Sequence, residues 1–311
     1  MDSHLDSFVK PLKLSKGDAI AVVAPASPFK YEQFQKGVRL LEKRGYEVRV
    51  PSGLFAKKGY LAGDDAHRAD MFHKAFLDEK IRGILCARGG FGSIRILEHL
   101  NYELISRHPK LFIGYSDISA LLSAIYIRCN MVVFHGPTVT DLAESDPETV
   151  DAFFEAIGSE KNYRISLKGS KVIKSGRVFG KIAGGNLTTL CHLAGTAYQP
   201  SFGGHIVFLE DRGEVPYRID RMLTQMRMAG YFEKISALIL GSFEDCGKEG
   251  GVLKIFEEQF QKKEIPIIAR MRAGHGATNL TLPFGVNAVL DTTKKQLDFD
   301  ISDTGGSFSE S

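Results

Sequence analysis

Cysteine is scarce in this sequence, and its spacing indicates neither a cross-linked nor a metal-binding protein. Only four of the 311 residues are cysteines, namely Cys86, Cys129, Cys191 and Cys246. None belongs to a CxxC pair, and at least two lie in apolar stretches. This pattern argues against a disulfide framework and against a zinc site.

Long hydrophobic runs and runs of one charge are also absent. No stretch approaches the roughly 20 apolar residues of a membrane-spanning helix, and the N-terminus lacks the basic and apolar segments of a secretory leader. The 40 basic and 37 acidic residues are spread along the chain, with no basic run that could follow a phosphate backbone. We therefore expect a cytoplasmic protein that binds neither membrane nor nucleic acid.

The first half of the chain alternates short apolar runs with amphipathic segments. The length and the 43% hydrophobic content favour two domains. The pattern predicts strands at residues 19–25, 46–50, 83–87, 111–115 and 131–137, and helices at 31–44, 65–77, 118–127 and 147–157, with another beginning near 93. Such alternation predicts a mostly parallel sheet covered by helices on both faces.

The composition changes after residue 157. Residues 158–175 are rich in Lys, Ser and Gly and lack apolar periodicity, which is typical of a linker between domains. We therefore expect an N-terminal domain at 1–157 and a C-terminal domain at 176–311. The second half mixes predicted strands (205–211, 237–243, 265–271 and a hairpin at 286–301) with helices such as 217–229, which predicts a smaller α+β domain.

Ser116 stands where a predicted strand meets a predicted helix, in "LFIGYSDISALL". A side chain at such a bend projects from the C-terminal edge of the sheet, where open α/β folds bind ligands. α/β-Hydrolases present a nucleophilic serine in this way, although Ile118 replaces the second glycine of their G-x-S-x-G pattern. The alternative interpretation is a serine that caps the following helix.

A glycine-rich stretch, "ARGGFGSIRIL", follows the strand predicted at 83–87. Its spacing differs from the G-x-G-x-x-G fingerprint of dinucleotide-binding proteins. The glycines could form a tight turn, or they could bring a backbone N–H close to a substrate. If Ser116 is a nucleophile, the N–H of Gly90 is a candidate donor to an oxyanion.

A nucleophilic serine needs a base, and nine histidines are available. His275 lies between two glycines in "MRAGHGATN", a context that favours an exposed loop, and His135 at the end of a predicted strand is its rival. An orienting carboxylate could come from Glu210 or Asp211, which end the apolar run "IVFLED". The same residues could also belong to a solvated turn.

Together these stretches resemble the LD-carboxypeptidase family of serine peptidases, which also includes microcin-immunity peptidases. The resemblance runs over nearly the whole chain, in the order of the family. It is carried by "APASP", "ARGGFGSIRIL", "FIGYSDISALL", "FHGP", "GGNLTTLCHLAGT", "FLEDRGEVPYRIDRML", "GSFEDC" and "GHGATNLTLPFGVNAVLD". It implies an α/β protein with a Rossmann-like N-terminal domain, a C-terminal α+β domain and an active site in the cleft between them.

The resemblance also implies roles for individual residues. The nucleophile would be Ser116, the base His275 and the orienting acid Glu210, with the backbone N–H groups of Gly90 and Asp117 as the oxyanion hole. Three arginines are candidates for binding the carboxylate of the substrate, namely Arg88, Arg212 and Arg218. The resemblance implies that neither a metal nor another cofactor is needed.

The family's activity implies a substrate and a partner. The expected reaction removes the terminal D-alanine from a murein tetrapeptide during cell-wall recycling, and the expected assembly is a homodimer. Two alternatives stay open, namely an immunity peptidase that cleaves a peptide-nucleotide antibiotic and a non-catalytic protein that binds muropeptides. The absence of tryptophan disfavours the first alternative, since the known nucleotide-directed members stack a tryptophan on the base.

Overall fold

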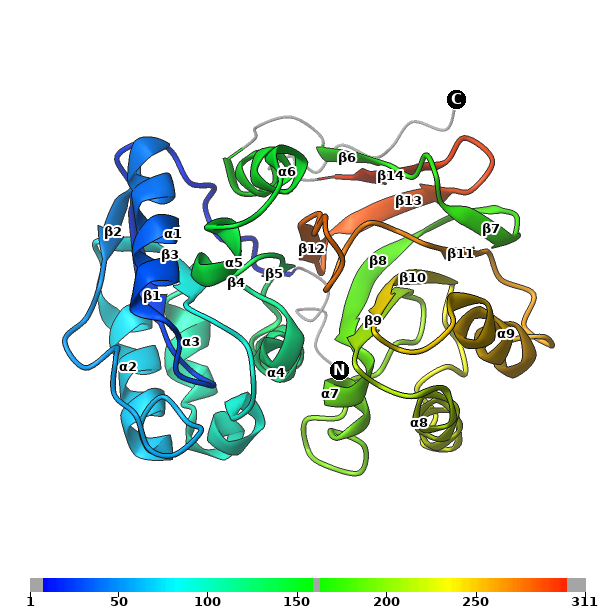
Figure 1. Ribbon diagram of the computed structural model, residues 1–311, viewed down its shortest axis with the longest axis horizontal. Helices are drawn as coiled ribbons and strands as arrows, with labels where there is room; N and C mark the ends of the chain where they lie inside the picture. Colours follow the sequence, from blue (N-terminus) through cyan, green and yellow to red (C-terminus); the bar gives the residue numbers. More distant parts are fainter. Residues whose placement is uncertain (1–7, 159–162, 301–311) are drawn as a thin grey trace, which may run out of the picture.

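Two β-sheets organise the protein, the first built mainly from the first half of the chain and the second from the second half (Figure 1). The computed structural model describes residues 8–158 and 163–300. Within this part of the chain no helix has both the length and the apolar character needed to span a membrane. The expected α/β fold, with a mostly parallel N-terminal sheet and a separate C-terminal sheet domain, is confirmed.

The first sheet has six strands in the order β12-β5-β4-β3-β1-β2. Its strands are β1 (Ala19–Val23), β2 (Glu47–Arg49), β3 (Ile81–Cys86), β4 (Leu111–Gly114), β5 (Val133–His135) and β12 (Leu282–Phe284). The strands β1 to β5 are parallel, whereas β12 pairs with β5 in the antiparallel direction. The carboxyl ends of β3 and β4 therefore meet at one edge, from which the glycine-rich stretch and Ser116 continue.

The helices of the first half follow from their local sequences. They are α1 (Tyr31–Lys43), α2 (Asp65–Leu77), α3 (Tyr102–Arg107), α4 (Ser119–Cys129), α5 (Val139–Leu142) and α6 (Pro147–Gly158), with the 3-10 helices η1 (Ser93–His99) and η2 (Ser116–Ile118). In α1 the buried side chains Phe34, Val38 and Leu41 share one face, as predicted. The carboxylate of Asp64 caps α2 by accepting a hydrogen bond from His67 N.

The second sheet has eight strands in the order β6-β14-β13-β8-β9-β10-β11-β7. They are β6 (Tyr163–Ser166), β7 (Lys171–Lys174), β8 (Arg177–Asn186), β9 (Ile206–Arg212), β10 (Ala237–Glu244), β11 (Ile267–Ala269), β13 (Asn287–Asp291) and β14 (Gln296–Phe299). The strands β8 to β11 are parallel, and the others join them in the antiparallel direction. Three helices accompany this sheet, namely α7 (Leu187–Cys191), α8 (Pro216–Met228) and α9 (Glu249–Gln259).

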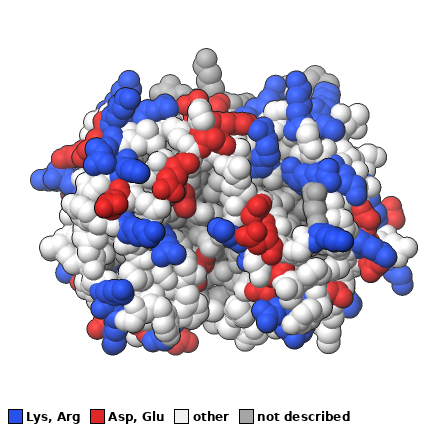
Figure 2. Space-filling view, viewed as in Figure 1, with Lys and Arg blue, Asp and Glu red and all other residues white. Residues whose placement is uncertain are grey.

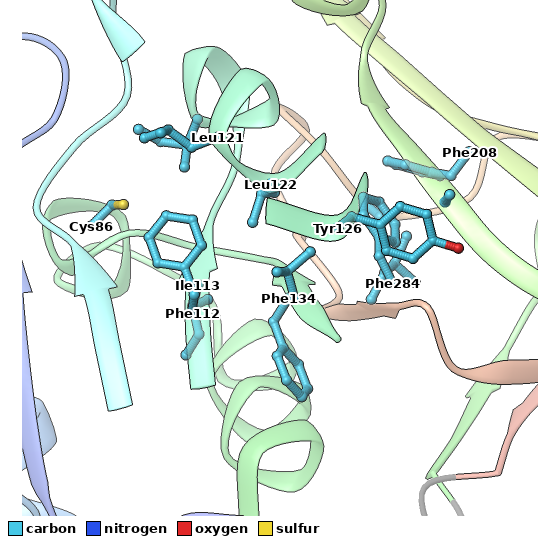
Figure 3. Close-up of a cluster of buried hydrophobic side chains, with 14 of the residues drawn as sticks. Cys86, Phe112, Ile113, Leu121, Leu122, Tyr126, Phe134, Phe208 and Phe284 are labelled. Carbon is cyan, nitrogen blue, oxygen red and sulfur yellow. The ribbon is translucent and has the colours of Figure 1, made fainter. Parts of the chain in front are cut away.

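Helix α4 lies between the two sheets and contacts β4 and β5 of the first and β8 of the second. Almost all of its side chains are buried, which is typical of a helix enclosed on every side. In Figure 3, Leu121 lies towards Cys86 and Phe112, whereas Tyr126 lies towards Phe208 and Phe284. One continuous hydrophobic core therefore joins the two halves and fixes how they sit relative to each other.

The segment predicted as a linker, residues 158–175, differs from that expectation in its described part. Residues 159–162 lie outside the described residues, but 163–166 and 171–174 form β6 and β7 at opposite edges of the second sheet. In β6 buried and exposed residues alternate, and no residue of β7 is fully buried, so neither strand needs an apolar run. In addition, β12 from the second half completes the first sheet, so the chain returns across the interface between the sheets.

Candidate active site

Ser116 follows β4 at a sharp bend and begins the 3-10 turn η2, which leads into α4. Its φ of 62° lies in the left-handed region, which residues with a side chain seldom adopt. The backbone of Gly89 passes so close that an added Cβ would lie 3.0 Å from the Cβ of Ser116. The strained bend therefore projects the hydroxyl group beyond the sheet edge, and the serine does not cap the helix.

His275 reaches Ser116 from the second half of the chain. It lies in the loop between β11 and β12, and its Nε2 is 3.0 Å from Ser116 Oγ. Its Nδ1 lies 2.6 Å from Glu210 Oε2, and its backbone N–H donates to the same oxygen at 3.2 Å. The structure therefore brings together Ser116, His275 and Glu210, the three residues expected from the sequence.

The carboxylate of Glu210 determines which nitrogen of His275 carries the proton. Glu210 lies on β9 and is fully buried, and an ionised carboxylate can only accept hydrogen bonds. Nδ1 of His275 is therefore the donor, which leaves the lone pair of Nε2 directed at the hydroxyl group of Ser116. This arrangement can remove a proton from Ser116 and stabilise the imidazolium that results.

Burial and charge act in opposite directions on His275. Burial lowers its pKa, but the hydrogen bond and charge of Glu210, with a contribution from Asp211, outweigh burial and raise the pKa overall. Burial also raises the pKa of Asp211 to about 6, helped by the neighbouring charge of Glu210 and opposed by hydrogen bonds from Thr188. Two adjacent buried carboxylates therefore favour a positive charge on His275.

Asn186 and Thr188 support these carboxylates, and the sequence analysis did not identify either. Asn186 Nδ2 donates to Glu210 Oε1 at 3.3 Å and to Asp211 Oδ1 at 3.0 Å. Thr188 donates to Asp211 Oδ2 from both its backbone N and its hydroxyl group. The stretch "GGNLTTLCHLAGT" was recognised only as part of the family pattern, since polar residues after a strand give no further local signal.

The glycine-rich loop lies against Ser116. Gly90 has a φ of 105°, and an added Cβ would lie 2.4 Å from Ser27 Oγ. Ser27 Oγ also accepts a hydrogen bond from Phe91 N at 3.0 Å. Asp117 is held by Ser93, whose backbone N–H donates to its carboxylate at 2.8 Å. The contacts of Ser27 and Ser93 therefore restrain the two residues whose N–H groups were predicted to bind an oxyanion.

Two hollows meet at His275, and Figure 2 shows the surface hollowed between the two halves of the molecule. One, of about 300 Å³, is lined by Gly90, Ser116 and Asp117 among others. The second, of about 440 Å³, is lined by charged side chains of both signs. Its charged lining residues are Lys30, Arg88, Asp141, Glu144 and Arg212.

The three arginines predicted to bind substrate differ in their positions. Arg212 lines both hollows, and Arg88 lines the larger one, where its guanidinium donates to Pro28 O. Arg218 lies on α8 with its guanidinium 3.7 Å from Glu214, which lines the smaller hollow, whereas Arg218 itself lines neither. Of the three arginines, only Arg88 and Arg212 therefore line the hollows that meet at His275.

His135, the rival histidine, is buried in the core. Neither ring nitrogen has a hydrogen-bond partner among the described residues, and the ring packs against Tyr115, Phe208 and Phe284. Burial lowers its pKa to about 4, so the ring is neutral near pH 7. His135 is therefore a neutral side chain packed in the core, and the histidine that contacts Ser116 Oγ is His275.

No cluster of His, Cys, Asp or Glu side chains suited to a metal ion occurs in residues 8–158 and 163–300.

Family models for the LD-carboxypeptidase N-terminal and C-terminal domains match residues 20–136 and 179–290. Among solved structures, the chain is similar to a MccF-like protein from Bacillus anthracis, with a TM-score of 0.87 and 26% identity over 94% of this chain and 99% of that one.

Three curated proteins also resemble the chain over most of their length. A probable murein peptide carboxypeptidase of Bacillus subtilis is 34% identical, with 92% of both chains covered. The murein tetrapeptide carboxypeptidase of Pseudomonas aeruginosa is 33% identical over 88% of this chain and 92% of that one. The microcin C7 self-immunity protein MccF of Escherichia coli is 30% identical over 91% of this chain and 93% of that one.

Proposed function

The chain belongs to the LD-carboxypeptidase family, and on that premise we propose that it is a serine carboxypeptidase that releases the terminal D-alanine from murein tetrapeptide. The observation that carries this proposal is the series of hydrogen bonds from Ser116 through His275 to Glu210. The names of two relatives, a murein peptide and a murein tetrapeptide carboxypeptidase, support the choice of substrate.

The first half of the reaction transfers the acyl group to Ser116. Nε2 of His275 takes the hydroxyl proton as Oγ attacks the carbonyl carbon before D-alanine, and the carbonyl oxygen becomes an oxyanion. The N–H groups of Gly90 and Asp117, which line the same hollow as Ser116, would donate to that oxygen. Protonated Nε2 then passes its proton to the nitrogen of D-alanine, which leaves as the C–N bond breaks.

The second half of the reaction restores the enzyme. His275 removes a proton from water, and the hydroxide attacks the ester carbon while Gly90 and Asp117 again bind the oxyanion. The bond to Ser116 Oγ breaks, and His275 returns the proton to that oxygen. The products are the shortened peptide with a free carboxylate and D-alanine. Throughout, the carboxylate of Glu210 keeps the proton of Nδ1 in place and offsets the positive charge on the ring.

The charged hollow beside His275 supports recognition of a small charged peptide. A carboxypeptidase must hold the terminal carboxylate of its substrate, and guanidinium groups suit this role because they bind a carboxylate with two parallel hydrogen bonds. Arg88 and Arg212 line this hollow. Arg212 Nε lies 3.5 Å from Asp245 Oδ2, whereas no carboxylate forms an ion pair with Arg88 among the described residues. We propose these two arginines as the substrate-binding cations, in preference to Arg218.

Two other functions remain as alternatives. MccF is a microcin self-immunity protein, so an immunity peptidase would share the fold and the proposed catalytic residues. The absence of tryptophan from the chain disfavours it, because stacking on a nucleotide base was the role expected of that residue. A non-catalytic protein that binds muropeptides has no need for a histidine placed between a serine and a buried glutamate.

The proposal is tested with three substrates. The purified protein is incubated with L-Ala-γ-D-Glu-meso-diaminopimelate-D-Ala, with its epimer ending in L-alanine, and with a nucleotide-linked peptide, and products are identified by mass. We expect rapid release of D-alanine and roughly a hundredfold slower release of L-alanine, since misplacing the scissile carbonyl by about 1 Å costs that much in rate. Equal rates on both epimers, or faster cleavage of the nucleotide-linked peptide, would contradict the proposed substrate.

A further inference from the structure

We propose that Thr149, in the first turn of α6, is a positioning residue that holds the His275 loop through Asn279. The inference rests on the proposed function, since it assumes that His275 is the base. Thr149 belongs to the first half of the chain, whereas His275 belongs to a loop that leaves the second sheet. The hydroxyl group of Thr149 thus ties the loop to the half of the protein that carries Ser116.

The need for such a contact follows from the path of the loop. Residues 270–281 run from β11 in the second sheet to β12 in the first, so the loop crosses between the two halves (Figure 1). His275 must contact Glu210 from one sheet and Ser116 from the other at the same time. A loop held only by the second half would leave the distance from His275 Nε2 to Ser116 Oγ unrestrained.

The second half holds one side of the loop through hydrogen bonds with Ser242. The hydroxyl group of Ser242, on β10, accepts a hydrogen bond from Gly276 N at 2.9 Å, and Ser242 N donates to Ala273 O at 3.0 Å. These contacts lie on either side of His275 and keep the loop beside Glu210. They do not reach the part of the protein that carries Ser116.

The beginning of α6 holds the other side of the loop. Thr149 Oγ1 accepts a hydrogen bond from Asn279 N at 2.9 Å, and both side chains are almost fully buried. Asp146 accepts hydrogen bonds from Thr149 N at 2.6 Å and from Thr278 Oγ1 at 2.5 Å. The loop residues 278 and 279 are therefore fixed to the residues that open α6.

Asn279 passes this restraint on to His275. Its Oδ1 accepts a hydrogen bond at 2.8 Å from the backbone N of Gly274, the residue directly before His275. A displacement of Asn279 would therefore move the peptide unit between Ala273 and Gly274, which leads directly into His275. The path from Thr149 to His275 consists of two buried hydrogen bonds, and buried bonds of this kind restrain geometry because a buried donor left unpaired is destabilising.

An ion pair also joins α6 to the loop, but its surroundings give it less influence. Arg272 Nη2 lies 2.6 Å from Glu148 Oε1, with 45% of the arginine side chain and 48% of the glutamate side chain exposed. Ion pairs exposed to this degree contribute little, since water and salt screen them. The buried hydroxyl group of Thr149 is therefore the contact expected to determine where His275 lies.

The test compares Thr149→Val, which keeps the shape and removes the hydroxyl group, with Thr149→Ser, which keeps the hydroxyl group. We expect Thr149→Val to lower kcat roughly 10- to 100-fold with little change in KM, because a misplaced base slows the reaction and not binding. Thr149→Ser should recover most of kcat. Thr292→Val is the matched control, since Thr292 is equally buried and bonds through its hydroxyl group to Gly176, away from the site.

A second readout does not depend on turnover. It is the NMR resonance of the proton between His275 Nδ1 and Glu210. This resonance should shift or broaden in Thr149→Val but not in Thr149→Ser or Thr292→Val. An unchanged kcat and resonance in Thr149→Val would overturn the proposal, as would equal losses of kcat in Thr149→Val and Thr292→Val. If the wild type releases no D-alanine while the resonance shifts as expected, the proposed function fails and the positioning role stands.

Discussion

The hydroxyl oxygen of Ser116 lies 3.0 Å from Nε2 of His275, although 159 positions separate these residues in the sequence. Ser116 follows a strand of the first sheet, and His275 contacts Glu210 on β9 of the second. The proposed catalytic geometry therefore depends on how the two sheets pack. The buried helix α4 and the strand β12 fix that packing, so substitutions far from the site can alter activity through the relative position of the sheets.

The first prediction concerns Gly274. Its φ is 99°, and an added Cβ would lie 2.5 Å from Glu210 Oε2. Gly274→Ala should therefore push the carboxylate and His275 apart and lower kcat at least tenfold, since both the hydrogen bond and the orientation of the ring would change. The measurement is kcat for the release of D-alanine, together with the melting temperature.

Gly169→Ala is the matched control for this substitution. Gly169 also has a positive φ, 86°, but an added Cβ there would meet no atom within 4 Å. Both variants incur the conformational cost of a side chain at positive φ, about 1 kcal/mol, and only Gly274→Ala incurs the clash. Full activity in Gly274→Ala would show that the fit between Gly274 and Glu210 does not matter for catalysis.

The second prediction concerns the pH dependence of activity. Only neutral His275 can accept a proton, and its pKa is raised because Glu210 and Asp211 outweigh burial. The value of kcat/KM should therefore rise with pH along a limb centred above 6.5, the ordinary value for histidine. Glu210→Gln removes the negative charge beside His275, so the effect of burial dominates and the pKa of the histidine falls. The rising limb of kcat/KM should therefore shift to lower pH, and kcat should fall roughly a thousandfold or more.

The deprotonation of His275 that raises activity with pH should lower the stability of the folded protein. A pKa that is raised on folding adds stability below the unfolded value near 6.5, and this contribution is lost as pH rises through the folded value. Wild type should thus lose stability relative to His275→Gln over the same range of pH in which activity appears. Chemical unfolding at several pH values measures this difference, and a parallel change in both proteins would contradict the assigned pKa shift.

The third prediction concerns His135, whose pKa is lowered to about 4 by burial. A pKa that is lowered on folding stabilises the folded protein at pH values above the unfolded pKa, near 6.5. This contribution is lost as the pH falls towards 4. Between pH 8 and pH 5 the free energy of unfolding should therefore fall by about 2 kcal/mol. His135→Leu should keep activity. Its free energy of unfolding should fall by about 2 kcal/mol less than that of the wild type between pH 8 and pH 5. Equal acid sensitivity of the two proteins, measured by denaturant unfolding, would show that His135 does not titrate as described.

Much of the fold was predictable because its signals are local. The helices α1, α2, α6 and α8 begin and end within a residue or two of the predicted bounds, since each presents one apolar face to the core. The sharp bend at Ser116 was predictable because an apolar strand runs directly into a helical pattern. The resemblance to a family then linked this serine to Glu210 and His275, which no local pattern could connect.

The remaining features depend on contacts between distant parts of the chain. The longest strand, β8, was not predicted, because Gly180, Gly184 and Gly185 interrupt its apolar pattern. Gly184 is required there, since an added Cβ would lie 1.8 Å from Phe208 O on the neighbouring strand. Likewise, the pairing of β12 with β5 joins segments from opposite halves of the chain, and no periodicity in the sequence reports such a pairing.

The most direct test of the account is the rate at which Ser116→Ala releases D-alanine from murein tetrapeptide, measured beside the wild type. We predict a fall in kcat of several orders of magnitude with an unchanged fold, because Ser116, His275 and Glu210 act as a unit and loss of the nucleophile removes the acyl-enzyme route. Circular dichroism and the melting temperature establish that the variant is folded. Turnover by folded Ser116→Ala at a rate near that of the wild type would contradict the assignment of Ser116 as the nucleophile.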